Sequence, residues 1–178
     1  MPYHQKRFEA VLNLFNIKTI PSLLDLIIPP KEGLFRCRVV YEPEFLDKIN
    51  IEYIPYIKRD INSFKIIKDE EIKYQHKYLD RTKIDVLFAQ KGDCDEIIIV
   101  KNNLITDTSI ANLAFLINNK WLTPKAPLLR GTTRERLLDS TIIEKANINI
   151  DDLSKVKKVA LMNAMVEFDV IDNFYFHF

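Results

Sequence analysis

The stretch EIIIVKNNLITDTSIANLAFLINNKWLTP, residues 96–124, decides the fold. The apolar runs EIIIV and LITDT flank a two-residue Asn-Asn turn, and a second Asn-Asn turn separates ANLAFLI from KWLTP. Apolar runs joined by two such residues are typical of β-hairpins, because asparagine tolerates the backbone that tight hairpin turns require. The stretch therefore predicts two consecutive hairpins.

Further elements are predicted on the N-terminal side of the hairpins. One apolar face predicts a helix over residues 4–16, and SLLDLII predicts a second over 22–28. LFRCRVVYEP alternates apolar residues with arginines and predicts a strand, as do INIEYIPYI and SFKIIK. This part of the chain is expected to consist of helices packed on an antiparallel sheet. Residues 82–91 predict a helix with Ile84, Leu87 and Phe88 facing inward.

On the C-terminal side, RGTTRERLLDS is predicted to start a helix. IIEKANINI is a predicted strand, DDLSKV a short helix and KKVALMNAM another strand. The expected fold class is α+β, with a small N-terminal domain over residues 1–78 and a larger C-terminal domain, rich in β-hairpins, over 79–178. The boundary then lies in KYLDR, residues 77–81.

Composition excludes several classes of function. The 178 residues include 26 basic and 25 acidic side chains, a net charge of +1, which gives no reason to expect a nucleic-acid or membrane partner. No apolar run approaches the roughly 20 residues of a membrane span, and MPYHQKRFEA lacks a signal-peptide core. Cys37 and Cys94 show no metal-ligand spacing, so no metal is expected and a reducing cytoplasm is the default.

Three features are candidates for chemistry, and each has a simpler alternative. Asp107 is an acid in a predicted strand, although an aspartate considered alone is more often a turn cap. Gly131, Thr132 and Thr133 begin a helix, where free N–H groups bind phosphate, or where a threonine simply caps the helix. Lys77 is either a reactive amine or an ordinary surface lysine.

Taken together, these residues resemble the class IV aminotransferase family, whose members use pyridoxal phosphate (PLP). The resemblance rests on a motif of acid, small residue, asparagine, x-T-P and G-x-x-R. It is matched by Asp107, Ser109, Asn112, Leu122-Thr123-Pro124 and Gly131-Thr132-Thr133-Arg134. Lys77-Tyr78-Leu79-Asp80-Arg81 resembles the lysine segment of the lyase branch, and His4 with Arg7 matches an H-x-x-R motif.

The resemblance implies roles for these residues. Lys77 would bind PLP as a Schiff base and move a proton, and Asp107 would pair with the pyridine nitrogen. Arg7, Gly131, Thr132 and Thr133 would hold the phosphate. The sequence departs from the family at Asp107, where a glutamate is usual, and before His4, where only Met1-Pro2-Tyr3 stand in place of a strand pair. The small domain is therefore expected to lack its first strands and to expose a sheet edge.

The C-terminal segment LMNAM, residues 161–165, bears on the reaction. It resembles the lyases that release pyruvate from aminodeoxychorismate to leave p-aminobenzoate, unless Asn163 merely satisfies the end of a strand. An amino-acid transaminase and an inactive remnant are the alternatives. Asn163 and either Arg36 or Arg38 are expected to bind the small amino substrate, because strand alternation is expected to let only one of the two arginines face the site. The resemblance also implies a homodimer.

Overall fold

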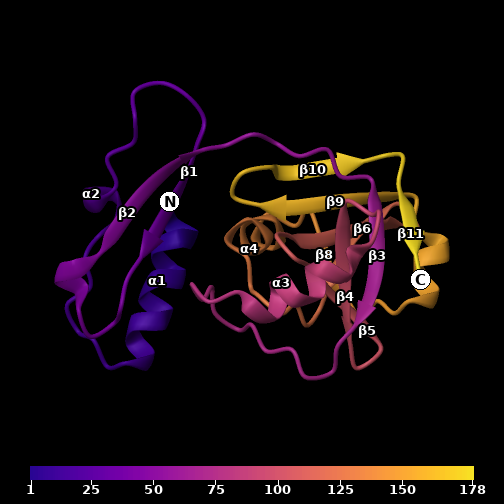
Figure 1. The fold of residues 1–178 in the computed structure, drawn as a ribbon, viewed down its shortest axis with the longest axis horizontal. Helices are drawn as coiled ribbons and strands as arrows, with labels where there is room; N and C mark the ends of the chain where they lie inside the picture. Colours follow the sequence, from indigo (N-terminus) through magenta and orange to yellow (C-terminus); the bar gives the residue numbers. More distant parts are fainter. The chain divides into compact units, whose positions relative to one another are not determined.

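The structure is a computed structural model that describes residues 1–178, and it divides into two compact units, Met1–Arg59 and Asp60–Phe178 (Figure 1). Each unit has its own core. This division lies earlier in the chain than the domain boundary predicted between residues 78 and 79. None of the helices combines the length and the apolar composition that crossing a membrane would require.

The first unit consists of a helix, a short helical turn and a two-stranded antiparallel sheet. Phe8, Leu12 and Leu23 form its buried core, so the helices cover apolar surface as their spacing predicted. The predicted helices and the first two strands are confirmed. The elements are α1 (Pro2–Leu14), α2 (Leu23–Leu26), β1 (Phe35–Val40), η1 (Leu46–Lys48) and β2 (Asn50–Pro55).

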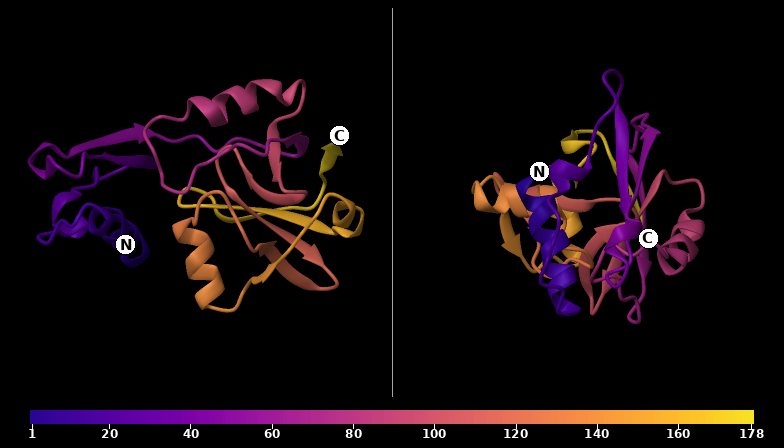
Figure 2. Two further views of the ribbon diagram at one scale, coloured as in Figure 1. Left: turned by 90° about the horizontal axis from the view of Figure 1, so that it is seen from below. Right: turned by 90° about the vertical axis from the view of Figure 1, so that its left-hand side faces the viewer.

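The second unit is built on one nine-stranded mixed sheet with helices α3 and α4 packed on it (Figure 2). The strand order is β10-β9-β6-β5-β4-β3-β11, and β7 pairs with β6 and β8. The α+β fold class is therefore confirmed. The elements are β3 (Ser63–Lys68), α3 (Thr82–Phe88), η2 (Ala89–Lys91), β4 (Glu96–Lys101), β5 (Leu104–Thr108), β6 (Asn112–Ile117), β7 (Lys120–Pro124), α4 (Thr132–Asp139), β8 (Glu144–Ala146), η3 (Asp151–Lys155), β9 (Lys158–Asn163), β10 (Glu167–Ile171) and β11 (Tyr175–His177).

Both predicted hairpins are present. β4 pairs with β5 and β6 pairs with β7, in each case antiparallel. The turns are Asn102-Asn103, with φ of 51° and 59°, and Asn118-Asn119, with φ of 51° and 61°. Two consecutive residues with positive φ are the conformation that matches the right-handed twist of the strands, and asparagine adopts it at low cost.

The strand SFKIIK was assigned to the wrong sheet. β3 does not extend the β1–β2 sheet; it lies parallel to β4 and begins the second unit. Asp95 fixes its start, because its Oδ2 accepts hydrogen bonds from the backbone of Asn62 and from the backbone and hydroxyl of Ser63. β3 therefore belongs to the sheet of the second unit because it pairs with β4, which follows it in the chain.

The central strand β4 is buried on both faces. Ile98 and Val100 join the core shared with β6 and β9, whereas Ile97 and Ile99 face the opposite core with Ile84 and Leu87 of α3. Helix α4 is anchored separately, by Leu137 against Ala114, Ala160 and Met162. Burying a leucine of this kind contributes about 1.5–3 kcal/mol. These contacts pack each helix against the sheet.

Candidate active site

The site begins at the turn between β5 and β6. The two strands are joined by one residue pair, Asp107 with Asn112. Thr108 closes the turn, because its Oγ1 accepts hydrogen bonds from the N–H groups of Ile110 and Ala111. The turn therefore holds a carboxylate and a carboxamide side by side.

Asp107 is buried and bound on both oxygens. Its Oδ1 accepts a hydrogen bond of 2.6 Å from Asn112 Nδ2, and its Oδ2 accepts one of 2.9 Å from the N–H of Leu129. Burial raises the pKa of Asp107 to about 6, while these hydrogen bonds and the charge of Arg134 oppose the rise. The simpler interpretation of Asp107 as a turn cap does not account for its bond from Leu129, which lies beyond the turn.

Helix α4 begins at Thr132, as the sequence predicted. The residue that caps it is Gly131, with φ −70° and ψ 143°, so neither threonine is the cap. Thr132 and Thr133 are both buried in the first turn. The N–H groups of a first helical turn, together with the positive end of the helix dipole, suit a phosphate.

Space rather than backbone freedom requires glycine at position 131. A Cβ at this position would lie 2.0 Å from Oδ1 of Asn112, which is an impossible contact. The Asn112 carboxamide cannot easily move aside, because its Nδ2 also donates to the carbonyl of Leu129 at 2.8 Å. The start of α4 is therefore packed directly against Asn112.

Arg134 links α4 to the end of β7. Its guanidinium is buried and donates to Thr123 Oγ1 at 3.2 Å and to the carbonyl of Pro124 at 2.8 Å. It also pairs with Glu135 at 2.6 Å, which neutralises the one acidic residue in the first turn of α4. Sequence reasoning placed Arg134 in a motif but did not identify this role.

Lys77 lies in the loop between β3 and α3 and is exposed. The Tyr74 hydroxyl donates to the carbonyl of Tyr78, and Arg81 Nη2 donates to the carbonyl of Ser109 at 3.1 Å. The lysine loop is thus tied to the turn that carries Asp107, a link that sequence reasoning missed. The segment also lines a pocket with Lys73, Tyr74, Tyr78, Leu79, Asp80, Arg81, Lys83 and Ile84.

The predicted arginines belong to the first unit. Arg7 lies on α1, and its charge opposes the increase that burial causes in the pKa of Tyr41. Arg36 and Arg38 are both exposed on β1. The expectation that only one of them can face a given side is wrong, because residues two apart on a strand share a face. Arg38 is paired with Glu52 on β2 at 2.5 Å.

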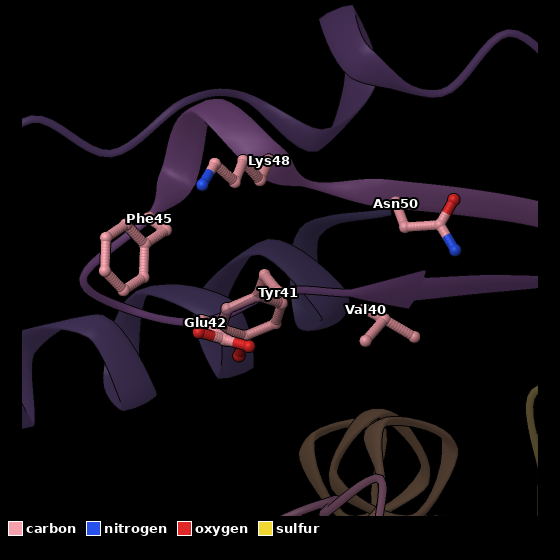
Figure 3. A pocket seen from close by; sticks show the side chains of 6 residues that line it. All are labelled: Val40, Tyr41, Glu42, Phe45, Lys48 and Asn50. Carbon is pink, nitrogen blue, oxygen red and sulfur yellow. The ribbon is translucent and has the colours of Figure 1, made fainter.

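A second pocket lies within the first unit, where β1 ends and β2 begins (Figure 3). The amine of Lys48 stands 5.1 Å from the centre of the Phe45 ring. The residues that line this pocket are Val40, Tyr41, Glu42, Phe45, Lys48 and Asn50. None of the predicted site residues lines this pocket.

Asn163 ends β9 and shapes the turn into β10. Its Oδ1 accepts hydrogen bonds from the N–H groups of Met165 at 2.8 Å and Val166 at 3.0 Å. Its Nδ2 donates to the carbonyl of Ile110 at 3.4 Å, in the turn after Asp107. Asn163 therefore does satisfy a strand end, and it also lies beside the β5–β6 turn.

The second unit contains a donor set that fits PLP. Asp107 is a buried carboxylate with lone pairs beyond those used by its partners, as a pyridine nitrogen requires. The α4 start supplies N–H groups, and it is fastened to Asp107 through Leu129. An anchor for the ring and an anchor for the phosphate are thus held by one network.

Comparison with known proteins supports the resemblance to the class IV aminotransferases. Residues 63–171 match the family described as amino-transferase class IV. An uncharacterized protein from Haemophilus influenzae is 39% identical over 163 residues, which is 92% of this chain and 82% of the relative.

Two solved structures share the fold along most of their length. A candidate 4-amino-4-deoxychorismate lyase from Haemophilus somnus has a TM-score of 0.83 and 38% identity, with 92% of this chain and 88% of the other covered. A candidate amino-acid aminotransferase from Mesorhizobium loti has a TM-score of 0.81 at 17% identity, with 99% and 91% covered. The chain therefore belongs to the class IV aminotransferase family, whose members are enzymes that use PLP.

Proposed function

We propose that the protein is a PLP-dependent lyase that converts aminodeoxychorismate to p-aminobenzoate and pyruvate. The observation that carries the proposal is the 38% identity, over 92% of the chain, to the candidate lyase from Haemophilus somnus. The segments KYLDR and LMNAM, which resemble the lyase branch, support the same reaction.

The residues around the β5–β6 turn would hold the cofactor. Asp107 would keep a proton on the pyridine nitrogen, and that positive charge would in turn favour the ionised carboxylate. The first turn of α4, with Thr132 and Thr133, would hold the phosphate together with Arg7. When bound, PLP withdraws electrons from the carbon that carries the substrate amine.

Lys77 would act at that carbon. Its amine would attach the cofactor in the resting enzyme and, once displaced by the substrate, would take the proton from the carbon bearing the amine. Loss of this proton and cleavage of the ring carbon–oxygen bond would release enolpyruvate, which takes up a proton to become pyruvate. The aromatic ring left behind would drive the reaction. Arg81 would support Lys77 by tying its loop to Ser109.

The substrate carries two carboxylates and needs polar partners. We assign these to Arg36, Arg38 and Asn163. An arginine fork matches a carboxylate, although Arg38 must first leave Glu52 or share its charge. Asn163 Nδ2 makes only a long bond to Ile110, so it has capacity for a substrate oxygen.

The reaction is tested by supplying purified protein with PLP and aminodeoxychorismate and measuring p-aminobenzoate and pyruvate. In parallel, branched-chain and D-amino acids are supplied with 2-oxoglutarate. Equal amounts of p-aminobenzoate and pyruvate are expected. Glutamate without p-aminobenzoate would assign the protein to the transaminases, and no product in either assay would indicate an inactive remnant.

We also propose that the enzyme works in the cytoplasm as a homodimer. Both cysteines, Cys37 and Cys94, are unpaired, which suits a reducing compartment. Light scattering should give about twice the chain mass of 21.0 kDa. A mass equal to one chain at micromolar concentration would contradict the dimer.

A further inference from the structure

Asn112 occupies the centre of the polar network that joins Asp107 to Leu129. It is 5% exposed, and its two carboxamide N–H groups reach different segments: Asp107 Oδ1 at 2.6 Å and the carbonyl of Leu129 at 2.8 Å. Leu129 returns a hydrogen bond from its N–H to Asp107 Oδ2 at 2.9 Å. Asp107, Asn112 and Leu129 therefore form a closed ring of three hydrogen bonds.

The opposite side of the same carboxamide faces the start of α4. Oδ1 of Asn112 occupies the space that a side chain at Gly131 would need, at 2.0 Å from the ideal Cβ position. The carboxamide thus touches the buried acid on one side and the helix cap on the other.

We propose that Asn112 is a positioning residue that sets the separation between the carboxylate of Asp107 and the N-terminus of α4. This inference rests on the proposed function, in which the separation is the distance between the carboxylate that anchors the PLP ring and the helix start that anchors the PLP phosphate. Asn112 would also keep Asp107 acidic enough to be ionised in the loaded enzyme, because its N–H stabilises the carboxylate. Arg134 is the charged side chain that acts on Asp107 in the same direction.

The first test is the titration of Asp107 in protein without cofactor. The carboxyl carbon is followed by NMR in aspartate-labelled protein, and Asp107→Asn identifies its signal. Asn112→Ala is expected to raise the pKa of Asp107, now about 6, by about one pH unit or more. Asn149→Ala is the matched control, because the Asn149 side chain also makes a hydrogen bond, accepting one from the N–H of Asp152, which is not part of the Asp107 network.

The second test is a double-mutant cycle in urea, again without cofactor. Gly131→Ala is expected to lower the urea midpoint in the wild type, because the new Cβ meets Asn112 Oδ1. In the Asn112→Ala background the same change should leave the midpoint nearly unchanged, since the obstructing atom is gone. If Asn112→Ala does not fold, Asn112→Ser replaces it, because serine is too short to reach Leu129 and Asp107 together.

The third measurement is PLP affinity, which Asn112→Ala should weaken by about tenfold or more. An unchanged pKa of Asp107, or an equal cost of Gly131→Ala in both backgrounds, would overturn the positioning role. Failure of the wild type to bind PLP would instead overturn the proposed function. The first two tests are independent of PLP, so the two failures are distinguishable.

Discussion

At the scale of single residues, Lys77 has the most specific proposed role, which is the covalent attachment of PLP. Lys77→Ala is expected to abolish covalent attachment of PLP, because no other amine would occupy its place at the cofactor. The measurement is borohydride reduction of the protein with PLP, followed by mapping of the labelled peptide. Lys73→Ala is the matched control, since Lys73 is exposed in the same loop. A label on another lysine in the wild type would contradict the assignment.

Asp107 carries a prediction about pH. Its folded pKa of about 6 exceeds the unfolded value of about 3.9, so the native protein binds more protons than the unfolded chain between these two values. The free energy of unfolding without cofactor should therefore fall by about 2–3 kcal/mol as the pH rises through this window.

Asp107→Asn isolates that contribution. The variant has no carboxyl group to titrate at position 107, so its free energy of unfolding should change less between pH 4 and pH 7 than that of the wild type. Denaturant titrations at several pH values measure the difference. Asp151→Asn, a change at an exposed aspartate, provides the control. Parallel pH curves for Asp107→Asn and the wild type would show that Asp107 does not titrate as described.

At the scale of elements, the start of α4 can be tested through its backbone. Thr132→Pro removes one N–H at the first helical position, where proline is tolerated, and Gly131 already has the extended ψ of 143° that a following proline requires. PLP affinity is expected to fall about tenfold or more, because a hydrogen bond to a charged phosphate is lost.

The matched control for that change is Thr132→Ala, which removes the hydroxyl but keeps the N–H. It should bind PLP more tightly than Thr132→Pro, and circular dichroism should show α4 in both variants. Equal affinity of the two variants would place the phosphate elsewhere.

Elements whose conformation is set by residues close together in the sequence were predictable. The Asn-Asn turns predicted both hairpins, because the turn residues themselves adopt the required positive φ. The partner of β3 was not predictable in this way, because the residues of β4 with which it pairs stand after an intervening loop and helix. β10 and β11 were missed: β10 is a five-residue strand that is only partly buried, and β11 is three residues long, so both give a short pattern.

The same distinction applies to the site. Asp107, Gly131 and the threonines were identified from their motif, which preserves residue types along the chain. Their contacts were not, because the Leu129 bond to Asp107 spans 22 residues and the Arg81 bond to Ser109 spans 28. Spacing in sequence carries no information about which carbonyl or N–H a distant loop presents.

At the scale of the whole molecule, the predicted site residues come from both units. Lys77, Asp107 and the α4 start belong to the unit Asp60–Phe178, whereas Arg7, Arg36 and Arg38 belong to Met1–Arg59. The family match covers residues 63–171 and so lies within the second unit. Arg7 therefore lies outside the family match, whereas Lys77, Asp107 and the α4 start lie within it.

Arg7→Ala tests that contribution. If Arg7 holds the phosphate, its loss should weaken PLP binding by about tenfold to a hundredfold, and Arg7→Lys should restore part of the affinity because it keeps the positive charge. Lys6→Ala is the control on the same helix, since Lys6 is exposed. Arg7 also acts on Tyr41 within the first unit, so denaturant unfolding of each variant must accompany the PLP titration. Wild-type PLP affinity in a stably folded Arg7→Ala would remove the first unit from the phosphate site and leave the α4 start as its anchor.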